Sequence, residues 1–178
     1  MLFLLNINLT EEDYFQYNRF HTTETPQGKA AIKKSHTVFI VTLVAMSAII
    51  LLLRGWSLPY CLAIGVWAII YFATYKNTVD KNLRKQIKRL KETGKLPFDP
   101  VSIFEFHEDK LVEITDDAHT ERKYTSIERV CVYKDSYIFL YQSSMGAYVL
   151  PLPQVRAQVN QEDFIRFLSQ KCNTVEYY

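Results

Sequence analysis

Two long stretches of this 178-residue chain contain no aspartate, glutamate, lysine or arginine. They cover residues 35–53 and 55–75, with Arg54 alone between them. Each is about as long as the ~20 apolar helical residues that cross a bilayer core of about 30 Å. The absence of charge therefore predicts two membrane spans, at about 36–53 and 57–75.

A single longer span is the alternative, and it would place Arg54 in mid-bilayer at a cost of a few kcal/mol. A glycine and a proline close to Arg54 favour a bend instead. We predict a transmembrane hairpin over residues 35–75, with Trp56, Tyr60 and Tyr75 as anchors at the interface. A soluble protein with a buried hairpin would need an apolar shell, and the remaining sequence is too short and too polar to provide one.

The chain also lacks the residues on which most catalytic and metal sites depend. Five glycines leave little material for phosphate-binding loops, and no nucleophile-elbow, Walker, dinucleotide or zinc signature appears. Cys61, Cys131 and Cys172 form no CxxC pair, so they predict neither a zinc site nor a disulfide framework and fit a reducing compartment. We expect a protein that is not an enzyme, with no catalytic residue, cofactor or metal.

Positive charges flank the two predicted spans at their outer ends. Segment 76–95 carries eight basic and two acidic residues, and four basic residues precede the first span, whereas the turn carries Arg54 alone. Because flanks rich in lysine and arginine stay on the cytoplasmic side, we predict a multi-pass protein of the cell membrane with both termini cytoplasmic. The N-terminal "MLFLLNINLT" has no basic leader and no small-residue cleavage pattern, so we do not expect a signal peptide.

Segment 76–95 is predicted to continue the second span as a basic amphipathic helix. Val79, Leu83, Ile87 and Leu90 recur at three- and four-residue spacing and form one apolar stripe. Two uses of this helix stay open: it lies on an anionic membrane leaflet, or its stripe packs on the cytosolic domain. On the first reading, six basic side chains contact the membrane surface: Lys76, Lys81, Arg84, Lys85, Lys88 and Arg89.

The rest of the chain predicts an α+β domain on the cytosolic side of this membrane protein. A strand over the first nine residues and a helix capped by Thr10 form the N-terminal segment 1–34. Segment 96–178 has the period of strands, and a final helix opens at Asn160 and closes one end of an antiparallel sheet. Six strands are expected, near 101–107, 109–115, 120–125, 128–134, 136–142 and 146–150. Whether the N-terminal strand joins this sheet is left open by the sequence.

The predicted domain is acidic, with 13 acidic and eight basic residues from Leu96 onward. Nucleic acid and phosphoinositide headgroups both require positive clusters on the domain that binds them, so we expect no nucleic-acid partner. The lipid bilayer is the expected partner of the hairpin. In the domain, "MGAYVLPLPQV" is expected to form a sheet edge, where an extended peptide can add as a further strand.

Four features, taken in order, resemble the YcxB-like family of bacterial membrane proteins: "LTEEDYFQYNRFH", the two-span hairpin, the basic helix and "YTSIERVCVYKDSYIFLYQSSMGAYVLPL". The resemblance covers nearly the whole chain and implies a pleckstrin-homology-like fold for its carboxyl half. Tyr124 stands where the family pattern has a tryptophan, Pro151 stands near an expected lysine, and "HEDKLVE" lacks a common glycine. The family implies no activity that can be carried over.

Three functional hypotheses follow. The leading one is a membrane-anchored, non-enzymatic module whose pleckstrin-homology-like domain binds a protein or peptide at the inner membrane face. The alternative is an immunity protein that neutralises a toxin or bacteriocin at the membrane. The third, a hydrolase, relies on His107 and Asp109, and a metal at His107, Glu108 and Asp109 would need ligands from elsewhere in the chain. Gly65 has no GxxxG partner, so the sequence does not define whether copies of the chain associate.

Overall fold

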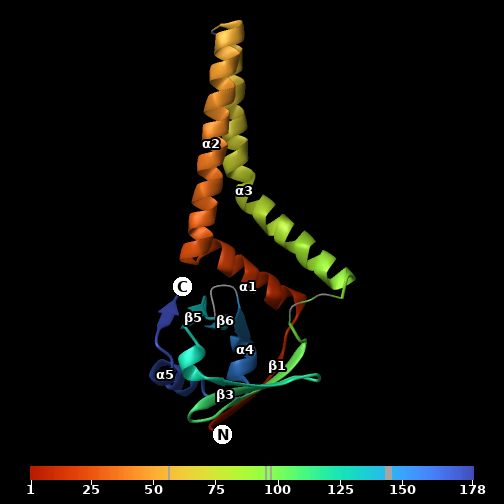
Figure 1. Cartoon of the computed structure of the whole chain (residues 1–178), viewed down its shortest axis with the longest axis vertical. Helices are drawn as coiled ribbons and strands as arrows, with labels where there is room; N and C mark the ends of the chain where they lie inside the picture. Colours follow the sequence, from red (N-terminus) through yellow and green to blue (C-terminus); the bar gives the residue numbers. More distant parts are fainter. Residues whose placement is uncertain (56, 95, 97, 143–145) are drawn as a thin grey trace. The chain divides into compact units, whose positions relative to one another are not determined.

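The structure is a computed structural model that describes residues 1–178 apart from 56, 95, 97 and 143–145 (Figure 1). Contacts divide the chain into two compact units. The β unit consists of Met1–Tyr17 together with Thr93–Tyr178, and the hairpin unit consists of Asn18–Glu92. The β unit is therefore built from both ends of the chain.

The hairpin unit contains two long helices, α2 (Pro26–Arg54) and α3 (Leu58–Glu92), which run side by side over the first part of α3 (Figure 1). Both are long and apolar enough to cross a membrane, as the sequence predicts. The most apolar window of each helix is 0% buried, and Leu52 and Ile69 are 87% and 70% exposed. Contiguous exposed apolar surface of this kind requires an apolar solvent or a partner.

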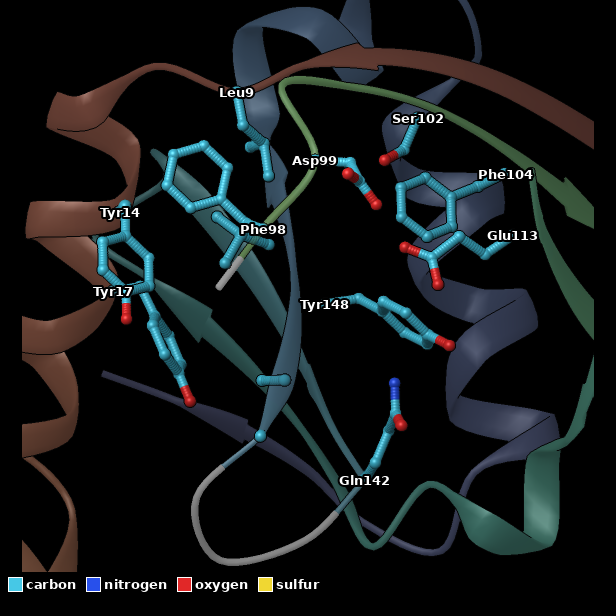
Figure 2. Close-up of a pocket in the computed structure, with 13 residues that line it drawn as sticks. Leu9, Tyr14, Tyr17, Phe98, Asp99, Ser102, Phe104, Glu113, Gln142 and Tyr148 are labelled. Carbon is cyan, nitrogen blue, oxygen red and sulfur yellow. The ribbon is translucent and has the colours of Figure 1, made fainter. Parts of the chain in front are cut away.

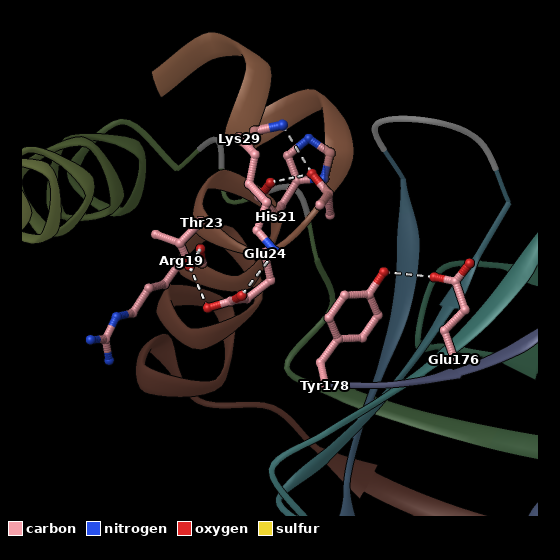
Figure 3. A network of polar contacts seen from close by, with 9 residues as sticks. Arg19, His21, Thr23, Glu24, Lys29, Glu176 and Tyr178 are labelled. Carbon is pink, nitrogen blue, oxygen red and sulfur yellow. Dashed lines mark hydrogen bonds and ion pairs between the residues drawn. The ribbon is translucent and has the colours of Figure 1, made fainter. Parts of the chain in front are cut away.

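A sharp corner joins α1 (Glu11–Thr23) to α2, within the segment "TTETPQG" (Figure 3). The Thr25 hydroxyl caps α2 by accepting a hydrogen bond from the backbone nitrogen of Gly28 at 3.1 Å. A Cβ on Gly28 would lie 2.2 Å from a carbonyl oxygen of α1, so the corner requires glycine there. An ion pair of 3.5 Å between Lys29 and Glu24 spans the corner.

The β unit contains two four-stranded sheets among the described residues. The strands are β1 (Phe3–Asn8), β2 (Val101–Phe106), β3 (Lys110–Ile114), β4 (His119–Lys123), β5 (Arg129–Tyr133), β6 (Tyr137–Tyr141), β7 (Ala147–Pro151) and β8 (Val175–Tyr177). One sheet has the order β1-β2-β3-β4 and the other β7-β6-β5-β8. The six expected strands are confirmed as β2 to β7. The question left open for the N-terminal strand is also answered, because β1 pairs with β2 and places Phe3 opposite Phe106.

The structure corrects the prediction of an antiparallel sheet followed by a single helix. β8 pairs with β5 in parallel, and a short helix, α4 (Leu152–Arg156), precedes the final helix α5 (Gln161–Lys171). β7 ends at Pro151, and Pro153 lies in the first turn of α4, where its missing N–H costs nothing. A three-residue strand and a five-residue helix are too short for hydrophobic periodicity to reveal them.

The hydrophobic core of the β unit lies under α5. Asn160 caps this helix, as predicted, and its side chain accepts hydrogen bonds from two backbone nitrogens at 2.9 and 3.2 Å. Phe164 on α5 is completely buried. Its ring contacts Phe3 on β1, with centroids 5.4 Å apart, and Phe106 on β2, with centroids 4.9 Å apart. The final helix therefore packs on strands from both ends of the chain.

Two glutamine side chains, one from α4 and one from the turn that follows it, cover the outer edge of β1. The backbone nitrogen of Asn6 donates to Gln158 Oε1 at 2.7 Å, and Gln158 Nε2 donates to the Asn6 carbonyl at 2.9 Å. Gln154 makes the same two bonds with Asn8, both at 2.8 Å. The two glutamines are four residues apart and the two asparagines two residues apart, and each glutamine reaches its own asparagine. The pair occupies backbone groups that would otherwise form a free sheet edge.

Replacing both glutamines, Gln154→Ala with Gln158→Ala, should lower the free energy of unfolding of the β unit by about 1–3 kcal/mol, because four hydrogen bonds are lost and a strand edge is exposed. Urea unfolding of the full chain in detergent, followed by near-ultraviolet circular dichroism, measures the change. Gln170→Ala on the exposed face of α5 is the matched control and should have no measurable effect. Equal stability of the double variant and the control would contradict this role.

Candidate functional site

A groove with a volume of 450 Å³ lies in the β unit beside β7 (Figure 2). Ligand pockets in proteins usually have volumes of about 300–1,000 Å³, and the volume of this groove lies within that range. It is lined by side chains from α1, β2, β3, β7 and their connections: Leu9, Tyr14, Tyr17, Phe98, Asp99, Ser102, Phe104, Glu113, Gln142, Gly146, Ala147, Tyr148 and Val149. The β7 residues belong to the segment that the sequence singled out as a sheet edge.

The floor of the groove is polar where the strand pattern calls for apolar side chains. Ser102, Phe104 and Phe106 alternate along β2, and all three are buried. Glu113 on β3 lies directly opposite Phe104, so its side chain projects from the same face of the sheet. Ser102 is only 3% exposed, and in the described part of the chain its hydroxyl makes no hydrogen bond. Core-facing positions that break the apolar pattern are frequent at functional sites.

The groove disfavours the charged form of the Glu113 side chain. Burial is the largest influence and raises the pKa of Glu113, ahead of the opposing effect of the Tyr148 hydroxyl. The nearby Asp99 carboxylate raises this pKa further, and Arg122 lowers it. Among the described residues, no lysine, arginine or histidine lies within ion-pair distance of Glu113 or Asp99. The groove therefore holds two carboxylates that lack a close positive partner within the described chain.

Aromatic rings form one wall of the groove. The rings of Tyr14 on α1 and Phe98 lie with centroids 5.0 Å apart. Tyr17, one turn further along α1, packs on Phe139 of β6 with centroids 5.6 Å apart. Burial raises the pKa of Tyr17 to about 12, so its hydroxyl stays protonated at neutral pH. A second aromatic contact, between Phe104 and Tyr148, forms the opposite side with centroids 5.2 Å apart.

The first turn of α1 is fixed to the sheet by Asp13, and this fixes the aromatic wall. The carboxylate accepts hydrogen bonds from the backbone nitrogen of Thr10 at 2.8 Å and from the Thr10 hydroxyl at 2.6 Å. Its other oxygen accepts a hydrogen bond of 2.9 Å from the Tyr137 hydroxyl on β6. Asp13 is 9% exposed, so these bonds satisfy a buried charge. The sequence predicted the Thr10 cap but not the contact with β6.

β7 lies at the end of its sheet, which confirms the central part of the prediction for "MGAYVLPLPQV". Residues 152–155 belong to α4 instead, and Met145 lies outside the described residues. Gln142 donates from its backbone nitrogen to the Gly146 carbonyl at 3.0 Å, and Leu152 donates to the carbonyl of Ser136 at 2.8 Å. Hydrogen-bonded pairs alternate along an antiparallel ladder. The backbone groups of Ala147 and Val149 therefore point away from β6, toward the outer edge of the sheet.

The residues predicted to meet the membrane lie on the hairpin unit. Tyr60 is 39% exposed, Tyr75 packs on His36 with ring centroids 4.4 Å apart, and Trp56 lies outside the described residues. Ile87, at the centre of the predicted apolar stripe, is 5% exposed. The six basic side chains of the predicted membrane surface are all exposed: Lys76, Lys81, Arg84, Lys85, Lys88 and Arg89. Their contact with lipid stays a prediction.

The residues considered for a hydrolase do not form a metal site in the described structure. His107 Nε2 lies 3.0 Å from a carboxylate oxygen of Glu105, two residues earlier in the chain. No group of three histidine, cysteine or acidic side chains suited to a metal ion occurs among the described residues. Cys131 and Cys172 are buried, and burial raises the pKa of both thiols. Both pack in the interior as small apolar residues.

The fold and the groove define an α+β protein with two helices apolar enough to span a membrane and a groove of 450 Å³ in its β unit. Comparison with protein-family models, curated proteins and solved structures found no match to this chain. Sequence reasoning located β7 but missed Ser102, Glu113 and Asp99. A signal was present for the first, since "VSIFEF" places a serine in phase with two phenylalanines.

Glu113→Gln should raise the melting temperature of the β unit at pH 8. A carboxyl whose pKa is higher in the folded chain binds its proton more tightly when folded, so it contributes stability at low pH that is lost as the pH rises through the raised pKa. Glutamine removes this half-buried charge, and the advantage of the variant should shrink as the pH falls toward 4.5, the ordinary pKa of glutamate.

Thermal unfolding of the full chain in detergent at pH 4 to 8 measures this difference. Glu121→Gln is the control of opposite sign, because a hydrogen bond from Lys110 lowers the pKa of Glu121 and its charge therefore favours the folded state. That variant should show no gain at pH 8. A melting temperature for Glu113→Gln that is below the original chain at pH 8 would contradict the prediction.

Proposed function

We propose that this chain is a membrane-anchored binding module without catalytic activity, whose β unit binds an extended segment of a partner protein at the cytoplasmic face of the cell membrane. The exposed apolar surface of α2 and α3 supports the anchor, since lipid is the solvent that would cover it. The excess of positive charge at the outer ends of the two helices supports cytoplasmic termini. The β unit then faces the cytosol.

One observation carries the binding role: β7 is an edge strand that lines a groove of 450 Å³. A peptide can add to such an edge through backbone hydrogen bonds, while its alternate side chains enter the adjoining pocket. Ala147 and Val149 would supply the backbone groups. Tyr14, Phe98 and Tyr148 would cover the inserted side chain.

We further propose a pleckstrin-homology-like fold for the β unit, as the YcxB-like resemblance implies. Two four-stranded sheets closed by a C-terminal helix fit that architecture. Domains with this architecture bind peptides along a sheet edge, which is consistent with the groove beside β7. The inference about function nevertheless depends on the groove itself, because one fold serves many functions.

A displayed peptide library tests this function directly. The full chain, held in nanodiscs of phosphatidylcholine, is the bait, and selected peptides are compared on two variants. Ala147→Pro removes a backbone donor from the outer edge of β7, whereas Ala147→Val keeps that donor. We expect selected peptides to bind about tenfold more weakly, or worse, to Ala147→Pro and with little change to Ala147→Val. Failure to select any peptide, or equal binding to both variants, would overturn the proposed role of β7.

A further inference from the structure

The groove beside β7 holds two carboxylates that have no ion-pair partner among the described residues, and this restricts what it can bind. Figure 2 shows the carboxylates of Asp99 and Glu113 and the hydroxyl of Ser102 directed into the same space. The two carboxylates repel each other, since Asp99 raises the pKa of Glu113. Ser102 is 3% exposed and, in the part of the chain that the structure describes, its oxygen has no hydrogen-bond partner. This oxygen is not one of the sealed polar atoms that lack a partner; it opens into the groove, where a ligand atom can bond to it.

An anion or a purely apolar side chain does not fit these groups. An anion would face two carboxylates, and an apolar side chain would remove water from them without replacing its hydrogen bonds. A positively charged donor satisfies both carboxylates and the serine oxygen at once. The aromatic rings at the groove, among them Tyr14, Phe98 and Tyr148, supply faces on which a cation binds favourably.

We infer that the groove selects a peptide strand that carries a basic side chain, which enters between Asp99 and Glu113 while the peptide backbone pairs with β7. Arginine is favoured over lysine, because its planar guanidinium presents five donors and stacks on aromatic rings. This inference rests on the proposed function, and it adds the chemistry of the partner. The acidic character of the segment from Leu96 onward attracts the same partner over a longer range.

The test uses two fluorescein-labelled hexapeptides, Val-Thr-Arg-Val-Thr-Val and its counterpart with citrulline in place of arginine. Citrulline has nearly the same shape but no charge, so the pair isolates the contribution of the cation. Binding to the full chain is measured by fluorescence anisotropy in phosphatidylcholine nanodiscs, whose neutral surface does not attract the peptides. We expect the arginine peptide to bind about tenfold more tightly than the citrulline peptide.

Variants of the groove locate the effect. Glu113→Gln and Asp99→Asn should each remove most of the preference for arginine, and both are close in shape to the original side chains. Glu121→Gln, an acidic position on β4 that does not line the groove, should keep the preference. A cooperative melting curve for each of the three variants would show that it is folded.

The outcomes separate this inference from the proposed function. Equal affinity for both peptides, with binding lost in Ala147→Pro, would leave the edge-strand function standing and overturn the selection of a cation. A preference for arginine that survives in Glu113→Gln and Asp99→Asn would also overturn it. Absence of binding by either peptide up to millimolar concentration would overturn the inference, while peptides selected from the library would still support the function.

Discussion

A cysteine introduced by Ser57→Cys should react with a membrane-impermeant maleimide added to intact cells, whereas a cysteine introduced by Asp117→Cys should react only after the cells are permeabilised. Ser57 lies between α2 and α3, and Asp117 lies in the exposed turn between β3 and β4. If both helices span the membrane with cytoplasmic termini, the two positions face opposite compartments. The expected difference is therefore all or none.

The native cysteines make this experiment simple. Cys131 and Cys172 are 0% and 7% exposed, so neither reacts in the folded chain, and Cys61→Ala removes the third. Labelling of Asp117→Cys from outside would show that the orientation is the opposite of the predicted one and that the groove faces the other side of the membrane. Recovery of the full chain in the soluble fraction without detergent would contradict the membrane anchor.

The hairpin was predictable because its signal is local and long. About twenty consecutive residues without charge admit few interpretations, and the stretch repeats on both sides of Arg54. The strands were predictable for a similar reason, since aromatic and β-branched residues alternate between recognisable turns. Helix α5 was located by Asn160, whose side chain caps it in the structure as the sequence indicated.

The groove could not be predicted, because its residues meet through pairings that no local pattern encodes. The hydrogen bond from Tyr137 to Asp13 joins positions 124 residues apart, and it places the first turn of α1 beside the sheet. The pairing of β1 with β2 likewise joins the two ends of the chain. A serine in phase with phenylalanines signalled an unusual position in β2, but only the fold shows that Glu113 shares its face.

Phe164→Ala should destabilise the β unit by about 3–5 kcal/mol, since it removes a completely buried aromatic ring and leaves a cavity. Domains of this size have a free energy of unfolding of about 5–15 kcal/mol, so the variant should be close to unfolding at 37 °C. Urea unfolding of the full chain in detergent measures the loss. Arg166→Ala on the exposed face of the same helix is the control and should change stability by less than about 0.5 kcal/mol.

The consequence should extend to the N-terminal strand, because the Phe164 ring contacts Phe3 as well as Phe106. Amide hydrogen exchange in β1 should therefore accelerate in Phe164→Ala together with exchange in β2, as expected for strands that share one core. Exchange that accelerates in β2 alone would show that β1 is held mainly by Gln154 and Gln158. A loss of stability below about 1 kcal/mol would contradict the packing of α5 on both ends of the chain.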